Sequence, residues 1–269
     1  QYRTFGKLDW KVSALGFGAM RLPVNDDNTA NIDQDKTNEM IHAAIEGGVN
    51  YFDTAYPYHK EHSEAALGRA LQGGLRERVA VATKSPIWLI NEPSDFDRLL
   101  DTQLERLQMD YVDFYLLHAL NQKSWEKVKK LDVLHRAEAA LADGRIRHLG
   151  FSFHDNLETF KQIVDGYDKW EFCQIQYNYM DITYQAGAEG MHYAASKGLA
   201  GIIMEPLLGG KLALDLPATR PLWDSADVKR TPADWALQWL WSQPEVSMVL
   251  SGMSTLEQEL NRKLETKEK

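Results

Sequence analysis

Four polar residues have the types that proton transfer to a carbonyl oxygen requires. Asp53 lies five residues before Tyr58, Lys84 follows further along the chain, and His118 comes directly after an apolar run. Lys84 is expected to pair with Asp53 inside a cleft. A lysine charge beside Tyr58 stabilises the phenolate and lowers the tyrosine pKa from its usual value of about 10. Tyr58 then becomes a proton donor, while His118 orients a carbonyl whose oxygen gains negative charge.

Reduction of a carbonyl needs a hydride as well as a proton. No amino-acid side chain delivers a hydride, so this chemistry requires a nicotinamide cofactor across the same site. The four side chains lie on separate segments of the chain, and the fold must therefore bring them to one end of a common framework.

The framework follows from apolar runs that alternate with segments of helical period, the pattern of repeated βα units. Strands are expected at residues 13–17, 50–53, 79–83, 112–117, 146–151, 172–176, 201–204 and 247–250. Helices are expected at residues 35–46, 63–71, 93–107, 131–142, 157–164, 188–196 and 232–241, with a last one beginning near Thr255. The long segment 208–228 is expected to form a functional loop over the strand ends.

Eight successive parallel strands with right-handed crossovers predict an α/β fold, a (β/α)8 TIM barrel. A doubly wound sheet is disfavoured because Gly16-Phe17-Gly18-Ala19 does not match Gly-x-Gly-x-x-Gly. Residues 2–9 are expected to form an N-terminal β-hairpin that closes one barrel end. Asp53, Lys84 and His118 end three adjacent strands, at the face where barrel enzymes place their active sites.

Composition limits the class of protein. The chain has 269 residues, a hydrophobic fraction of 44% and a formal net charge of −9. We expect a single domain spanning residues 1–269, no nucleic-acid partner and no membrane segment. Cys173 is the only cysteine, which excludes an internal disulfide and favours a reducing, cytoplasmic location. The oligomeric state stays open.

Several motifs together resemble the aldo-keto reductases, and the resemblance spans nearly the whole chain. They are Gly18-Ala19-Met20-Arg21, Phe52-Asp53-Thr54-Ala55-Tyr56-Pro57-Tyr58, Ala82-Thr83-Lys84, Leu116-Leu117-His118 and Ile146-Arg147-His148-Leu149-Gly150-Phe151-Ser152. The resemblance implies a catalytic tetrad of Asp53, Tyr58, Lys84 and His118. It also implies an NADP(H) cofactor, with NAD(H) left open, and an aldehyde or ketone substrate that is reduced to an alcohol.

The resemblance further assigns residues to each part of the cofactor. Ser152 and Gln174 would bind the nicotinamide carboxamide, and Met204 stands where the family often has an aromatic ring against the nicotinamide. The loop predicted to close over the pyrophosphate contains Pro206, Leu207, Gly209, Gly210 and Lys211. The adenosine-side phosphate would lie against Gly252, Ser254, Thr255 and Gln258.

The chain departs from the family pattern at two of these places. The family usually has Ser-Asn where this chain reads Ser152-Phe153-His154. Many relatives carry a Lys and an Arg where Gly252 and Gln258 stand. Without these cations, NADPH is expected to be preferred over NADH by a factor of only about ten to a hundred.

Other features concern the substrate and the branch of the family. Candidate walls of the substrate pocket are the aromatic and thioether side chains Met20, Tyr56, Trp88, Tyr177 and Trp223. Segments 151–155 and 173–181 resemble a bacterial and archaeal branch, some of whose members carry a C-terminal iron–sulfur domain. Such a domain needs a cysteine cluster, which this sequence lacks, and no metal site is expected.

Three other interpretations stay open. Lys84 at a barrel strand end also fits a Schiff-base aldolase. The fold also fits a redox-sensing module that holds nicotinamide and turns over slowly, like the potassium-channel β subunits. His59, Glu61 and His62 suggest a metal hydrolase, although their spacing is not that of a helical histidine pair.

Overall fold

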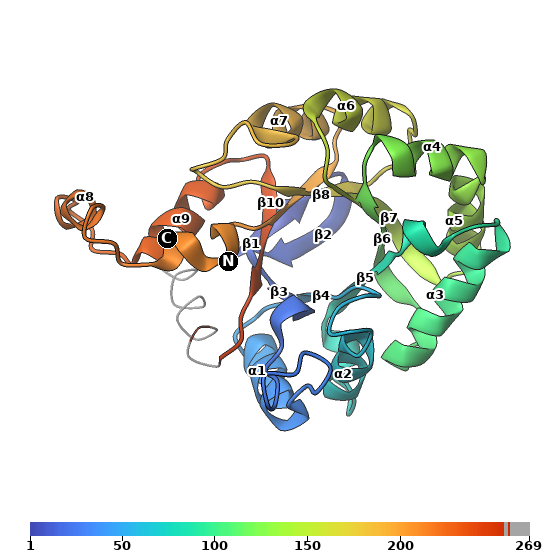
Figure 1. The fold of residues 1–269 in the computed structure, drawn as a ribbon, viewed down its shortest axis with the longest axis horizontal. Helices are drawn as coiled ribbons and strands as arrows, with labels where there is room; N and C mark the ends of the chain where they lie inside the picture. Colours follow the sequence, from blue (N-terminus) through green and yellow to red (C-terminus); the bar gives the residue numbers. More distant parts are fainter. Residues whose placement is uncertain (256–257, 259–269) are drawn as a thin grey trace.

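A closed barrel of parallel strands forms the centre of the molecule (Figure 1), as the sequence predicts. The computed structural model describes residues 1–255 and 258. In this part of the chain the strand order around the barrel is β10-β3-β4-β5-β6-β7-β8-β9. The strands are β3 (Leu15–Gly18), β4 (Tyr51–Asp53), β5 (Ala80–Ser85), β6 (Val112–Leu120), β7 (Ile146–Phe153), β8 (Phe172–Gln176), β9 (Ala200–Met204) and β10 (Val246–Gly252).

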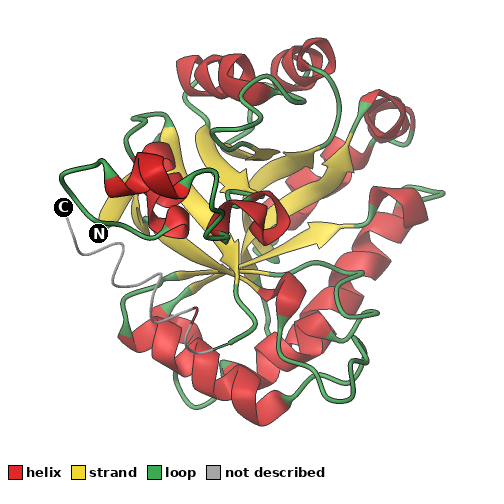
Figure 2. Ribbon diagram, turned by 60° about the vertical axis from the view of Figure 1, so that its left-hand side comes forward, coloured by secondary structure: helices red, strands yellow, loops and turns green. Residues whose placement is uncertain are grey.

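Helices surround this barrel on its outer face (Figure 2). They are α1 (Gln34–Glu46), α2 (Ser63–Ala70), α3 (Ser94–Leu107), α4 (Gln122–Lys130), α5 (Val133–Ala142), α6 (Leu157–Asp165), α7 (Gly187–Ser196), α8 (Arg220–Asp224) and α9 (Pro232–Trp241). Short 3-10 helices include η1 (Ala19–Arg21), η3 (Ile87–Leu89) and η4 (Leu208–Ala213). The helix expected near Thr255 lies largely outside the described residues.

Two helices were not expected from the sequence. A single helix was predicted at residues 131–142, but α4 precedes it and ends before Asp132, whose φ of 51° interrupts the helical path. Asn121 and Ser124 form a reciprocal cap at the start of α4. Helix α4 is rich in lysine and buries only Trp125 and Val128. Two apolar residues are too few to produce a helical periodicity in the sequence. The second, α8, lies within the segment expected to be a loop.

The N-terminal hairpin closes one end of the barrel. Strands β1 (Tyr2–Phe5) and β2 (Leu8–Ser13) pair antiparallel. Phe5 is fully buried, and its ring lies 5.0 Å from that of Phe114, 5.7 Å from that of Phe172 and 6.3 Å from that of Tyr51. Because β4 and β8 begin at Tyr51 and Phe172, this aromatic cluster fills the amino end of the barrel. The carboxyl ends of the strands therefore remain for the site.

Helices α2 and α3 pack closely behind strand β5. The apolar stripe of α3 is buried as predicted, with Phe96 and Leu100 fully inaccessible. Gly68 of α2 lies against the end of α3, where a Cβ atom would stand 2.3 Å from the carbonyl oxygen of Leu107. Only glycine permits this approach.

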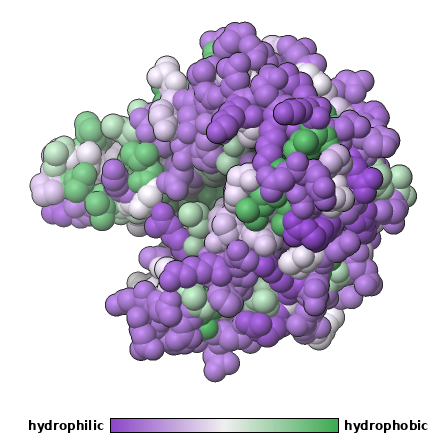
Figure 3. Space-filling model, turned by 45° about the vertical axis from the view of Figure 1, so that its right-hand side comes forward, coloured by the Kyte–Doolittle hydropathy of each residue, from purple (hydrophilic) through white to green (hydrophobic). Residues whose placement is uncertain are grey.

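Residues 214–230 form an arm that extends from the barrel and carries α8 (Figure 1). Trp223 of the arm stacks on Trp235 of α9, with ring centroids 6.0 Å apart. Figure 3 shows hydrophobic residues gathered on this projection, whereas the surface of the barrel in this view is mostly hydrophilic with smaller hydrophobic patches. Leu222 is 65% exposed and Val228 51% exposed.

No helix in the described part of the chain is long and apolar enough to cross a membrane.

Candidate active site

Asp53 and Lys84 form a buried ion pair at the carboxyl ends of β4 and β5. The Lys84 Nζ lies 2.5 Å from Asp53 Oδ1 and also donates to the carbonyl oxygen of Thr54 at 2.8 Å. The two strands run parallel, with Asp53 opposite Ala82, which brings Lys84 next to the carboxylate. Burial lowers the pKa of Lys84, but the Asp53 carboxylate and the Tyr58 hydroxyl together outweigh it, so this pKa lies above its ordinary value. Lys84 is therefore held as a cation.

Tyr58 lies in the loop after β4, with its ring centroid 5.0 Å from Lys84 Nζ. Burial raises the pKa of the Tyr58 hydroxyl more than the Lys84 charge lowers it, and the resulting pKa is above the ordinary value. The sequence-based expectation of a net lowering is therefore wrong for this structure. The lysine acts in the expected direction, but the sequence did not show how deeply the tyrosine is buried.

His118 lies within β6, and its ring faces two aromatic neighbours. The ring centroids are 6.2 Å from that of Tyr58 and 5.2 Å from that of Trp88. Its Nδ1 is buried and has no hydrogen-bond partner among the described residues. Burial, followed by the charges of Lys84 and His154, holds the pKa of His118 well below its usual value. His118 is thus a neutral imidazole at physiological pH.

A buried polar network behind β5 fixes the backbone of Lys84. Gln103 of α3 donates to the Lys84 carbonyl oxygen at 3.0 Å and to Glu64 Oε1 at 2.6 Å. Thr83 donates to the same Glu64 oxygen at 2.6 Å, and Tyr115 donates to Gln103 Oε1 at 2.7 Å. Gln103 was not predicted as part of the site, because a single glutamine on an apolar helix face gives no chemical signal in the sequence.

Ser152, Gln174 and Met204 lie on neighbouring strands of the barrel. Ser152 of β7 is opposite Gln174 of β8, and its Oγ accepts a 2.8 Å hydrogen bond from the backbone N–H of Ala119. Gln174 Nε2 lies 3.8 Å from the sulfur of Met204. Gln174 Oε1 is buried and has no partner among the described residues. A buried acceptor of this kind needs a donor, and a carboxamide NH2 is such a donor.

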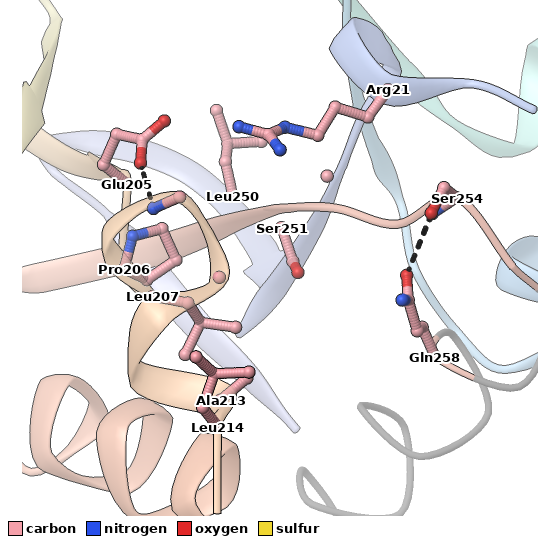
Figure 4. A pocket seen from close by; sticks show the side chains of 13 residues that line it. Arg21, Glu205, Pro206, Leu207, Ala213, Leu214, Leu250, Ser251, Ser254 and Gln258 are labelled. Carbon is pink, nitrogen blue, oxygen red and sulfur yellow. Dashed lines mark hydrogen bonds between the residues drawn. The ribbon is translucent and has the colours of Figure 1, made fainter. Parts of the chain in front are cut away.

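A pocket of about 370 Å³ opens beside these residues, between η4 and the end of β10 (Figure 4). Seven of the residues assigned to the cofactor line it: Pro206, Leu207, Gly209, Gly210, Gly252, Ser254 and Gln258. Lys211 and Thr255 do not line it. Arg21 and Glu205 do. Neither was predicted from the sequence, because Arg21 lies far along the chain from the glycine loop and Glu205, although only four residues before Gly209, is a carboxylate and gives no signal for a phosphate site.

The backbone and hydroxyl donors expected to bind phosphate already have partners. Gly209 N–H donates to Glu205 Oε2 at 2.6 Å, and Gly210 N–H donates to the Leu207 carbonyl at 2.9 Å. At the other end, the N–H and hydroxyl of Ser254 both donate to Gln258 Oε1, at 3.0 and 3.4 Å. Each donor must exchange its partner before it can bind a phosphate.

The candidate substrate walls separate into two groups. Met20 and Trp88 are 56% and 48% exposed, and Trp88 faces His118. The other three have neighbours elsewhere. Tyr56 lies under the Arg106 guanidinium of α3, at 4.3 Å from the ring centroid. The ring of Tyr177 packs on Trp239 and its hydroxyl bonds Gln243, and Trp223 belongs to the arm.

The histidine-rich loop after Tyr58 has a structural arrangement. Both ring nitrogens of His59 bond the backbone, Nε2 to the Leu22 N–H at 3.0 Å and Nδ1 to the Thr29 carbonyl at 2.8 Å. Glu61 pairs with Arg106 at 2.5 Å. Within residues 1–255 and 258, no group of three His, Cys, Asp or Glu side chains could hold a metal ion.

A closed (β/α)8 barrel with its titratable groups at the carboxyl ends of the strands defines the class of barrel enzymes. Residues 14–264 match the model of the Aldo/keto reductase family. The chain therefore belongs to the aldo/keto reductase family and is an oxidoreductase.

Named relatives are a dehydrogenase and a reductase, and solved structures share the barrel fold. The chain is 28% identical to L-galactose dehydrogenase of Arabidopsis thaliana, over 96% of this chain and 85% of that protein. It is also 28% identical to 6-dehydroglucose reductase of Novosphingobium aromaticivorans, over 90% of this chain and 83% of that protein. The holo form of the aldo-keto reductase AKR11C1 from Bacillus halodurans matches with a TM-score of 0.82 at 23% identity, over 100% of this chain and 91% of that one.

An aldo-keto reductase from Klebsiella pneumoniae, solved in complex with NADPH, matches with a TM-score of 0.76 at 22% identity, over 99% of this chain and 89% of that one. At these identities the two structural matches confirm the barrel fold.

Proposed function

We propose that this protein reduces a small aldehyde or ketone to an alcohol, with NADPH as the hydride donor. The observation that carries the proposal is the Lys84–Asp53 ion pair beside Tyr58 and His118. When bound, the nicotinamide supplies a hydride to the carbonyl carbon. The Tyr58 hydroxyl donates its proton to the carbonyl oxygen, so that one hydride and one proton together give the alcohol.

Each neighbour of Tyr58 has a distinct role in this proposal. Lys84 stabilises the phenolate that remains after proton transfer, and Asp53 keeps Lys84 charged and in place. His118 is neutral, and its Nε2 is proposed to donate a hydrogen bond to the carbonyl oxygen as negative charge develops there. Met20 and Trp88 are proposed to contact the rest of the substrate.

The residues present fit a nicotinamide dinucleotide. Gln174 Oε1 lacks a partner among the described residues and would accept from the carboxamide, with Ser152 beside it and Met204 against the ring. A Cβ atom at Gly210 would meet nothing within 4 Å, and the nearest atoms to one at Gly252 would be those of the Arg21 side chain, at 3.6 Å. These glycines leave an open cradle for the pyrophosphate. Ser254, Thr255 and Gln258 are proposed for the adenosine-side phosphate.

Relatives support the classes of cofactor and substrate. The Klebsiella pneumoniae structure was solved in complex with NADPH, and two of the named relatives act on a sugar or a dehydro-sugar. Sugar aldehydes and ketones therefore belong in the first substrate panel. We further propose that residues 1–269 act as one domain and belong to the bacterial and archaeal branch indicated by segments 151–155 and 173–181. A cytoplasmic location also stays a prediction.

Replacing the proposed proton donor tests the assignment. Tyr58→Phe should keep the fold and the nucleotide affinity but lower the rate of carbonyl reduction by about 10²- to 10⁴-fold. Steady-state oxidation of NADPH with a reactive aldehyde measures this change. Tyr56→Phe is the matched control, because Tyr56 lies in the same loop but packs under Arg106. Near wild-type turnover of Tyr58→Phe would disprove the tetrad.

Two alternatives make different predictions. A Schiff-base aldolase needs an uncharged lysine, whereas the Asp53 carboxylate raises the pKa of Lys84, so borohydride should trap no adduct on Lys84. A redox-sensing module would consume one equivalent of NADPH and then stop. Repeated turnover with excess aldehyde excludes that function.

A further inference from the structure

The charges that line the pocket between η4 and β10 are unusual for a site that receives phosphate groups. Among the described residues that line it, Glu205 is the only anion and Arg21 the only cation. A pyrophosphate carries two negative charges, which a carboxylate in the same pocket repels. A cation is needed to offset both the phosphates and Glu205.

The glycine loop does not supply a comparable attraction. Its two N–H groups already donate to Glu205 Oε2 and to the Leu207 carbonyl, and Lys211 does not line the pocket. Glu205 thus occupies the position at Gly209 N–H that a phosphate oxygen would take in a glycine loop. The strongest free donor for an anion must come from another element.

Arg21 comes from the opposite side of the pocket. It is the last residue of η1, which directly follows β3, and Gly18 of β3 pairs with Gly252 of β10. A Cβ atom on Gly252 would stand 3.6 Å from Cγ and Cδ of Arg21, so the arginine side chain lies along this glycine.

The guanidinium of Arg21 is directed toward one end of the pocket. Figure 4 shows it beside the end of the Leu250 side chain and above Ser251, aimed toward the side of Glu205 and away from Ser254. Arg21 is exposed, and it forms no ion pair or side-chain hydrogen bond with another described residue. Its five N–H donors are therefore available to a bound anion.

We propose that Arg21 binds the pyrophosphate of the nicotinamide dinucleotide and offsets the carboxylate of Glu205. This inference rests on the proposed function, and it names a residue outside the segments assigned to the cofactor. Because both nucleotides contain the pyrophosphate, Arg21 contributes to affinity and not to the choice between NADPH and NADH.

Titration of protein fluorescence with NADPH and with NADH tests the proposal. Arg21→Gln should raise the Kd of both nucleotides by the same factor, about ten- to a hundred-fold, because a charged hydrogen-bond pair is lost. Arg21→Lys should restore part of this loss, since it keeps the charge but not the two-pronged geometry. Circular dichroism confirms that each variant is folded.

Two further variants sharpen the test. Glu205→Gln keeps an acceptor for the Gly209 N–H but removes the negative charge. This variant should therefore bind both NADPH and NADH with a lower Kd. Arg78→Gln removes a positive charge that pairs with Glu46 outside the lining of this pocket, so it controls for the change in net charge. Its Kd values should equal those of the wild type.

The outcomes separate this inference from the proposed function. A loss of affinity for NADPH alone would place Arg21 at the 2′-phosphate and overturn the inference. Unchanged Kd values for both nucleotides in Arg21→Gln would also overturn the inference, whether or not the KM for the aldehyde rises. That result would leave the proposed function intact. If the wild type binds neither nucleotide, the proposed function fails and the inference fails with it.

Discussion

At the scale of single residues, the site depends on how burial and charge compete. Lys84 and Asp53 neutralise each other out of contact with water, while His118 stays uncharged because it is buried beside a cation. For Tyr58, burial outweighs the lysine and raises the pKa of the hydroxyl. A raised pKa keeps the proton on Tyr58 at neutral pH, which suits a proton donor in the direction of reduction.

Removal of the lysine charge tests this balance. Lys84→Met should lower carbonyl reduction by an amount comparable to Tyr58→Phe, about 10²- to 10⁴-fold. Reduction requires the protonated tyrosine, so activity falls as pH rises through the pKa of Tyr58. Without Lys84 that pKa rises further, and the alkaline limb of the pH profile of kcat should move to higher pH.

The single variant leaves Asp53 buried without its partner, which destabilises the protein. Asp53→Asn combined with Lys84→Met removes both charges and serves as the folded comparison. An alkaline limb at the wild-type position in the double variant would mean that another group tunes Tyr58.

At the scale of elements, the adenosine end of the pocket depends on one segment after β10. Gln258 Oε1 accepts from both the N–H and the hydroxyl of Ser254, and residue 252 itself is a glycine without a charged side chain. Gln258→Arg should release the two donors and add a charge, which widens the preference for NADPH over NADH. Ser254→Ala should narrow it. Kd values for both nucleotides measure the change, and a constant ratio across the three proteins would place the 2′-phosphate elsewhere.

The contact between α2 and α3 also determines the site, because α3 carries Gln103. Gly68→Ala would place a Cβ 2.3 Å from the Leu107 carbonyl oxygen, which forces the helices apart. Helix propensity alone predicts that this change stabilises the protein by up to about 1 kcal/mol. We expect destabilisation instead, measured as a lower urea midpoint. A urea midpoint above that of the wild type would show that α2 and α3 can move apart without a loss of stability.

Sequence patterns predicted the elements better than their contacts. Each predicted strand overlaps a strand of the barrel, because buried parallel strands produce short, continuous apolar runs. Helix α4 escaped detection because only Trp125 and Val128 of its residues are buried. Asp53, Lys84 and His118 were predicted as site residues from their positions at expected strand ends, although β5 continues to Ser85 and β6 continues two residues beyond His118, to Leu120. Arg21 and Glu205 were not, since a pocket between two loops depends on side-chain directions that periodicity does not encode.

At the scale of the whole molecule, the two ends of the barrel have opposite characters. The amino end is filled by the aromatic cluster around Phe5, whereas the carboxyl end holds the ion pair, the buried Gln174 amide and the pocket. Different residues thus stabilise the fold and form the candidate active site. This separation is possible because the active site of a barrel is confined to one face.

This separation can be measured. Phe5→Ala should lower the free energy of unfolding by about 3–5 kcal/mol, as expected for removal of a fully buried aromatic ring. The Kd for NADPH and the kcat of the folded protein should stay at wild-type values. Urea unfolding and fluorescence titration of the same preparation give both quantities. A changed Kd for NADPH would show that packing of the N-terminal hairpin affects the cofactor-binding residues at the other end of the barrel.

The environment of Cys173 has a practical consequence for labelling. This sole cysteine lies on β8, is fully buried, and has a pKa that burial raises to about 12. A maleimide reacts with thiolate, so the folded wild type should remain unlabelled. Leu222→Cys on the arm, at a position that is 65% exposed, would then accept a single fluorophore without removal of the native thiol. Energy transfer from bound NADPH to that fluorophore would report the distance between the arm and the nucleotide during turnover.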